Sequence, residues 1–147
     1  MGLDTSHGCW HGGYISFMHW RCKLAEVAGF PPLALMEGCY QPHNRSWFTD
    51  KSAIMVLEIL RPTLELLPIR WNYFKNDPLT ILLRHSDCEG TIAAADCAPL
   101  AYRLAELLPL LPDEDGGGHI GNWRKKTQTF IDGLFAAASA DEPVEFH

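Results

Sequence analysis

The strongest constraint on the fold is a helical pattern of large side chains in the last quarter of the chain. The positions on this pattern are Trp123, Thr127, Phe130, Ile131, Leu134, Phe135 and Ala138. They recur at steps of three and four residues, so they share one face of a helix with 3.6 residues per turn. The pattern predicts an amphipathic helix. At 147 residues the chain is long enough for a single domain with a core of its own, spanning residues 1–147.

Three more helices are expected from apolar periodicity and from residues that start or stop helices. The four expected helices cover residues 7–28, about 50–60, about 94–108, and 123 onwards. Gly29 and the pair Pro31-Pro32 end the first helix, and Asp50 is a favourable N-cap for the second. Pro109 ends the third.

Strands are expected at only two places. Residues 78–85, PLTILLRH, form a short apolar run after Asp77, which predicts a buried strand. The alternating sequence VEFH at 144–147 is compatible with a second strand beside it, which would bring His147 near His85, and the alternative is an exposed terminal histidine without a role. Residues 113–122 are rich in glycine and are predicted to form a flexible loop. Together these elements indicate an α+β fold, mostly helical, with a small β-sheet.

The segment HSDCEGTIAAAD at 85–96 partly matches the twelve-position calcium loop. Asp87, Glu89 and Gly90 fall on positions 3, 5 and 6 of that loop. However, position 1 is His85, a nitrogen ligand that suits zinc better than calcium, and position 12 is Asp96 in place of the longer glutamate. The pattern therefore favours a structural turn, in which Gly90 adopts a positive φ, over a bound calcium ion.

A second cluster of polar residues occurs in DTSHGCWHGGY at 4–14. His7 and His11 are four residues apart, so on the expected helix they would share a face and could provide two zinc ligands. A third ligand would come from His85, Asp87 or His147. The alternative is a helix start capped by a hydroxyl, with two structural histidines, and the sequence leaves both interpretations open.

The stretch GGGHIGNWRKKT at 116–127 places glycines and basic residues at the start of the last helix. Free backbone amides and the positive end of the helix dipole favour an anion there, next to Trp123, Arg124 and Lys125. The residues do not match a Walker A loop, because Asn122-Trp123 stand where Lys-Ser/Thr is required. A solvated linker that leads into a basic helical turn is the alternative.

Composition and net charge argue against several kinds of partner and against a membrane or secreted location. The formal net charge is −6, which argues against broad binding to nucleic acids. No apolar run reaches the length of a membrane span, and no basic start followed by an apolar block indicates a signal peptide. The expected location is therefore the cytoplasm. The five cysteines show no zinc-ribbon spacing and are expected to be reduced.

These observations predict a ligand site built mainly from the two polar segments and the start of the last helix. The candidate ligand-binding residues are Asp4, Thr5, His7, Trp10, His11, Tyr14, His85, Asp87, Trp123, Arg124 and Lys125. The candidate metal ligands are His7, His11, His85 and Asp87, for Zn²⁺, Mn²⁺ or Ca²⁺.

Three segments together resemble a group of small uncharacterised proteins of bacteriophages and actinobacteria. These are LDTSHGCWHGGYISFMHWR, the segment LLRHSDCEGTI with DCAPLAYRLAELLP, and FIDGLFAAASADEPVEFH. The resemblance implies a phage or prophage origin, and hence the cytoplasm of the host cell, but no established activity.

The leading expectation for function is a protein that binds a small anionic, phosphorylated ligand, such as a nucleotide signal of host defence. A metal-dependent hydrolase is the first alternative. A protein-binding inhibitor that displays an exposed apolar patch is the second. A homo-oligomer is compatible with each of the three.

Overall fold

The computed structural model describes residues 2–39, 55, 58–59 and 68–147. Its α-helices are α1 (Tyr14–Val27), α3 (Leu79–Leu83), α4 (Ala94–Leu107) and α5 (Trp123–Ala140). Its strands are β1 (Gly2–Asp4), β2 (His11–Gly13), β3 (Gly90–Ile92) and β4 (Val144–Phe146). Its 3-10 helices are η1 (Ser6–Gly8), η2 (Leu33–Leu35), η4 (Trp71–Phe74) and η5 (Leu108–Leu110). The fold is thus mostly helical α+β, as the sequence predicts, while the helix expected at 50–60 lies outside the described residues.

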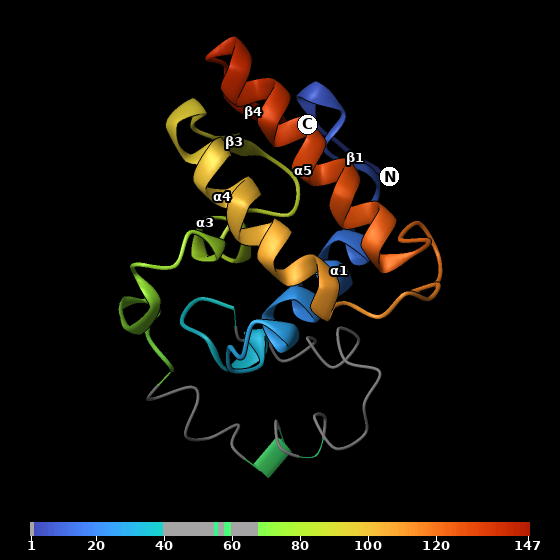
Figure 1. Ribbon diagram of the computed structural model, residues 1–147. Coiled ribbons are helices and arrows are strands. Elements are labelled where there is room, and N and C mark those ends of the chain that lie inside the picture. Colours follow the sequence, from blue (N-terminus) through green and yellow to red (C-terminus); the bar gives the residue numbers. More distant parts are fainter. Residues whose placement is uncertain (1, 40–54, 56–57, 60–67) are drawn as a thin grey trace.

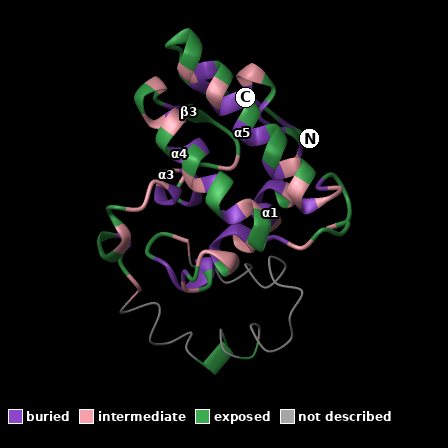
Figure 2. Cartoon of the chain, viewed as in Figure 1, coloured by how far each residue is buried: buried purple, intermediate pink, exposed green. Residues whose placement is uncertain are grey.

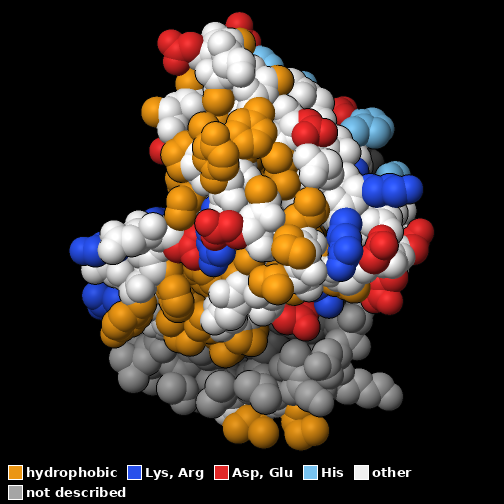
Figure 3. All heavy atoms as spheres, viewed as in Figure 1, with side chains coloured by type: hydrophobic (Ala, Val, Ile, Leu, Met, Phe, Trp, Pro, Cys, Tyr) orange, Lys and Arg blue, Asp and Glu red, His pale blue; other side chains and the backbone are white. Residues whose placement is uncertain are grey.

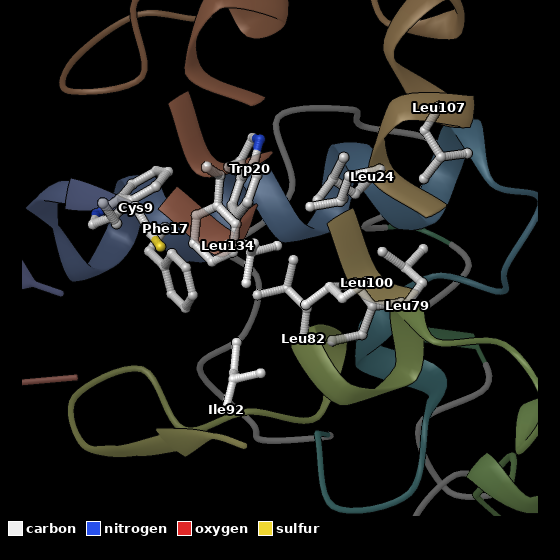
Figure 4. Packing of buried hydrophobic residues seen from close by; sticks show 14 of the residues in the cluster. Cys9, Phe17, Trp20, Leu24, Leu79, Leu82, Ile92, Leu100, Leu107 and Leu134 are labelled. Carbon is white, nitrogen blue, oxygen red and sulfur yellow. The ribbon is translucent and has the colours of Figure 1, made fainter. Parts of the chain in front are cut away.

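The core lies between the helices. α4 and α5 run antiparallel side by side, with α1 and α3 against them (Figure 1). Each long helix turns buried residues inwards and exposed residues outwards (Figure 2). Leu24 of α1, Leu82 of α3 and Leu100 of α4 point towards one another in this core (Figure 4). Within the described part of the chain, no helix is both long enough and apolar enough to cross a membrane.

Helix α5 confirms the amphipathic pattern read from the sequence. The carbonyl oxygen of the Asn122 side chain caps its first turn by accepting hydrogen bonds from two backbone amides. Asp141 ends the helix in the left-handed conformation, at φ 54°. Midway along, Gly133 allows the segment around Cys9 to lie directly on the helix, since a Cβ there would stand 2.9 Å from the backbone nitrogen of Cys9.

An aromatic cluster joins the N-terminal segment to α1 and α5. The rings of Trp10 and Phe17 lie 5.0 Å apart, edge to face, and those of Trp20 and Phe130 lie 4.8 Å apart. Trp20 also donates a hydrogen bond of 2.9 Å from its indole nitrogen to the hydroxyl of Thr127, so its buried polar atom is satisfied. Trp10 and Trp20 are therefore part of the hydrophobic core.

The short strands form two antiparallel pairs that are joined through the last residues of the chain. β1 pairs with β2, and β3 pairs with β4. An antiparallel bridge between Thr5 and Phe146, with two backbone hydrogen bonds between Asp4 and His147, connects the pairs. The strand predicted at VEFH is confirmed, but its partner is β3 and not residues 78–85.

The prediction of a strand at 78–85 is wrong, because most of this segment forms helix α3. Asp77 accepts a hydrogen bond of 2.9 Å from the amide of Leu79, which starts the helix. Leu79, Leu82 and Leu83 are buried, and their spacing of i, i+3 and i+4 places them on one helical face, whereas a strand would need both of its faces buried. A short apolar run is ambiguous between the two structures, and tertiary packing decides it here.

The prediction of a helix starting at residue 7 is also wrong, since α1 begins only at Tyr14. Gly12 and Gly13 instead form part of β2, opposite β1. Gly12 has φ 157°, and a Cβ there would lie 3.0 Å from the Cβ of His119 and 3.3 Å from the indole nitrogen of Trp10. Each of the two glycines would weaken a helix by about 1 kcal/mol relative to alanine. In the strand, by contrast, Gly12 is needed because neighbouring side chains lie too close for a Cβ.

Candidate functional site

A hollow of about 230 Å³ lies beside α1, next to the turn that follows α3. Its polar part comes from that turn, residues 84–87, and from one side of α1. The lining residues are Met18, Arg21, Leu33, Gly38, Cys39, Leu83, Arg84, His85, Ser86 and Asp87. Two residues predicted as ligand-binding, His85 and Asp87, therefore line the same hollow.

The central side chain of the hollow is Arg21, which is only 1% exposed. Its guanidinium forms an ion pair with Asp87 and donates to the backbone carbonyl oxygens of Leu82, Leu83 and His85. Burial lowers the pKa of Arg21 to about 10, so the group stays charged at neutral pH. Its Nε is buried and has no hydrogen-bond partner in the described part of the chain.

His85 is held at the edge of the hollow by its neighbours. Its ring lies 4.0 Å from the ring of Phe146, and its Nδ1 is 2.8 Å from the carbonyl oxygen of Ser86. Gly90, the first residue of β3, faces the imidazole ring, and a Cβ at Gly90 would stand 3.2 Å from Nε2 of His85. The turn thus fixes the imidazole between an aromatic ring and a glycine.

Residues 85–89 form a turn that leads into β3, and the positive φ predicted for Gly90 is confirmed. Gly90 has φ 114° and begins strand β3, and Ala94 begins α4 two residues after that strand ends. The carboxylate of Asp87 is occupied by Arg21. Among the described residues, the acidic side chains of the segment 85–96 do not gather around one centre, and the turn after α3 presents His85 and Asp87.

The charges that line the hollow sum to a positive value. Two guanidinium groups, Arg21 and Arg84, stand against the single carboxylate of Asp87. Arg84 is exposed, and its guanidinium carbon lies 5.9 Å above the ring of Trp71. Neither arginine is among the candidate ligand-binding residues, although the pair Trp20-Arg21 in the sequence is of a type that can clamp a phosphate. The available signal for Arg21 was its place between Phe17 and Leu24 on the apolar face of α1, where a charge needs a partner.

The candidate residues of the N-terminal segment pair off separately and do not form one helical face. His11 contacts the carboxylate of Asp4 through Nδ1, and both side chains are largely exposed. Nε2 of His7 lies 3.1 Å from the carboxylate of Glu142. His7 has φ 56° within η1, which points its side chain away from the direction that a helix would give it. The helical placement of the two histidines is therefore wrong.

The remaining residues of this segment have structural contacts. The hydroxyl of Thr5 accepts a hydrogen bond of 2.8 Å from the amide of Trp10, which closes the loop around η1. Trp10 is buried in the aromatic cluster, and Tyr14 is half-buried at the start of α1.

The four candidate metal ligands do not come together. Each has a separate neighbour: Glu142 for His7, Asp4 for His11, Phe146 for His85 and Arg21 for Asp87. Among the described residues, no group of three or more His, Cys, Asp or Glu side chains is placed to hold a metal ion. The five cysteines, all of them among the described residues, form no disulfide with one another.

The start of α5 does not offer the anion cradle expected from its sequence. The side chain of Asn122 already accepts from the amides of Arg124 and Lys125, at 3.0 and 3.1 Å. Arg124 donates to the backbone carbonyl oxygens of Leu111 and Pro109, so it ties the loop to the end of α4.

The other groups near this helix start are also in use, apart from exposed Lys125. Trp123 is buried against Gly116, and Lys126 donates a hydrogen bond of 2.8 Å to the carbonyl oxygen of His11. The loop at 113–122 is closed by a backbone bond of 2.7 Å from Gly116 to Gly121, while its flexibility stays a prediction.

Comparison with family models, with curated proteins and with solved structures finds no match to this chain. The resemblance to small phage and actinobacterial proteins therefore stays a prediction, and the function is inferred from the geometry of the chain itself.

Proposed function

We propose that the chain binds a small phosphorylated ligand in the hollow around Arg21. The observation that carries this proposal is the buried guanidinium of Arg21 at the wall of the hollow, with one N–H donor left without a partner in the described residues. A buried donor without a partner costs about 1–3 kcal/mol. A ligand oxygen would recover that cost once Asp87 moves away and opens access to this nitrogen, which protein atoms enclose.

The surrounding groups suit a phosphate. Arginine is well adapted to phosphate because its planar fork of N–H groups matches two oxygens at once. Arg84 brings a second, exposed guanidinium to the hollow, and Ser86 brings a hydroxyl. Against these stands the carboxylate of Asp87, which an anion has to displace from Arg21 or approach from the side of Arg84.

The size of the hollow limits what it can enclose. Sites for drug-sized ligands measure roughly 300–1,000 Å³. A hollow of about 230 Å³ has room for a phosphate head group, with the rest of the ligand outside it. Sequestration of a nucleotide signal would be one use of such a site, and the phage-like resemblance of the sequence supports that use.

Isothermal titration calorimetry with a nucleoside monophosphate, with the matching nucleoside and with inorganic phosphate tests the proposal. We expect heat of binding with the phosphorylated compounds and none with the nucleoside. Arg84→Gln should weaken binding by ~10-fold, because it removes a donor without touching the core. Arg70→Gln is the matched control, since Arg70 is exposed and lies outside the hollow. Equal affinities of the Arg84→Gln variant and the unmodified protein, or no binding at all, would overturn the proposal.

A further inference from the structure

A second hollow, of about 520 Å³, lies between η4 and α4 and contains none of the residues of the first. Its walls are built from flat side chains: Tyr73 and Phe74 on η4, Pro78 at the start of α3, and Pro99 and Tyr102 on α4. Tyr73 is 80% exposed and Tyr102 is 65% exposed. The two tyrosines therefore stand up on opposite sides of an open groove, which we call the tyrosine groove.

The apolar surface continues beyond the tyrosine groove. The ring of Tyr102 meets Phe135 of α5 edge to face, with 5.2 Å between the ring centroids. Leu110, just after α4, is 60% exposed. Hydrophobic side chains accordingly spread over the face formed by α4 and α5 (Figure 3). An open apolar groove of this kind fits an extended chain better than a compact small molecule, which a protein usually encloses almost completely.

The charged groups of the groove select against an anion. Arg103 donates to Asp77 from Nε and Nη2, at 3.0 and 3.1 Å, and to Glu106 from Nη1, at 3.0 Å. All three nitrogens of the guanidinium are thus engaged within the protein. Two carboxylates against one guanidinium leave a net charge of −1, and Glu106 is 68% exposed. A positively charged group beside Glu106 would complete this arrangement.

We propose that the tyrosine groove binds a proline-rich segment of a partner protein that carries a basic residue next to its prolines. Proline-rich segments adopt the polyproline II helix before binding, and they dock on grooves lined by aromatic side chains. Tyr73 and Tyr102 provide the two aromatic ridges between which proline rings insert. Glu106 provides the carboxylate for the basic residue.

Fluorescence anisotropy with the full chain tests this proposal. The probe is a dye-labelled peptide in which one arginine precedes a run of prolines. Two matched peptides serve as controls: glutamate followed by the same prolines, and arginine followed by alanines. We expect each control peptide to bind ~10-fold more weakly than the probe.

Variants of the protein locate the binding. Tyr73→Ala and Tyr102→Ala should each weaken binding of the probe ~10-fold, and both side chains are exposed enough for the variants to fold. Ile15→Ala, which removes a 67% exposed side chain elsewhere, should leave it unchanged.

Three results would overturn the proposal. They are equal binding of the glutamate peptide, no binding of the probe up to about 1 mM, and binding that does not respond to the two tyrosines. A dimer in analytical ultracentrifugation that Tyr102→Ala dissociates would assign the groove to a second copy of the chain instead.

Discussion

The buried guanidinium of Arg21 and the carboxylate of Asp87 form an ion pair that ties helix α1 to the turn after α3. The two residues differ in exposure, since Arg21 is 1% exposed and Asp87 is 36% exposed. Arg21 therefore needs Asp87 to neutralise its buried charge, whereas water can still solvate the carboxylate of Asp87. The same pair forms one wall of the proposed phosphate site, so stability and binding are linked at this point.

Asp87→Ala is expected to lower the free energy of unfolding by about 1–3 kcal/mol, because it leaves a buried charge without its partner. The loss is smaller than for a fully buried pair, since solvent reaches the aspartate. Urea unfolding measures it. Replacing both residues, with Arg21→Met and Asp87→Ala together, should recover part of the loss, as no charge is then left buried. If the loss of stability in the double variant equals the sum of the losses in Arg21→Met and Asp87→Ala, the two residues do not interact energetically.

Residues 144–147 are predicted to be essential for stability. Phe146 is 5% exposed and packs on His85 and Phe17, so Phe146→Ala should cost about 3–5 kcal/mol. Glu145→Ala is the matched control, because its exposed side chain should matter by less than about 0.5 kcal/mol. Thermal unfolding of the two variants compares them. A small loss for Phe146→Ala would show that the β3–β4 pair contributes little.

Gly133→Ala is expected to destabilise the protein even though alanine favours a helix. The new Cβ would stand 2.5 Å from the sulfur of Cys9 and 2.9 Å from its backbone nitrogen. Backbone atoms cannot rotate away as the end of a side chain can, so we expect a loss of about 1–3 kcal/mol in urea unfolding. Ser139→Ala, at an exposed position of the same helix, should change stability by less than about 0.5 kcal/mol. A neutral Gly133→Ala would mean that α5 can move away from Cys9.

Stability should fall as the pH rises above the ordinary range of a thiol. Burial raises the pKa of Cys9 and of Cys22 from 9.0 to about 12. The unfolded chain loses these protons near 9.0, while the folded chain keeps them up to about 12. The contribution of these two thiols to the free energy of unfolding is thus fully present below their unfolded pKa of 9.0, and it is lost as the pH rises towards the folded pKa of about 12. Urea unfolding across that window should show a falling free energy, with a smaller slope in Cys9→Ala. An unchanged slope in that variant would contradict the assignment to Cys9.

The thiols should also differ in their reactivity. Cys9 and Cys97 are buried, whereas Cys88 is exposed in the turn between α3 and β3. A colourless thiol reagent that releases a coloured product should therefore modify Cys88 first in the folded protein, and Cys88→Ser should remove this fast phase. All five thiols should react at similar rates after denaturation. A fast phase that survives Cys88→Ser would contradict this order.

The sequence predicts the long helices well because their periodicity extends over several turns. α5 starts at Trp123 and α4 starts at Ala94, both as expected. The short elements depend on partners that are distant along the chain. Residues 79–83 could bury the same leucines as a strand or as a helix, and packing against α1 and α4 selects the helix.

The candidate site was predictable in part. His85 and Asp87 are polar residues in a segment whose glycine indicates a turn, and both line the hollow. The histidines of the N-terminal segment share a face only if the segment is one α-helix, whereas the structure places His7 in η1 and His11 in strand β2. The pairing of Arg21 with Asp87 joins residues far apart in the sequence, and no local pattern encodes it.

The bridge between Thr5 and Phe146 has a consequence for synthesis of the protein on the ribosome. The first strand of the chain can complete its pairing only after residues 144–147 have been translated and have left the exit tunnel. At about 5–20 residues per second, more than a hundred intervening residues take on the order of ten seconds to be added. During that time Leu3 and the rings of Trp10 and Phe17 lack the cover that Phe146 and α5 later provide. We therefore expect the N-terminal segment to complete its packing late, after its aromatic residues have been exposed on the nascent chain.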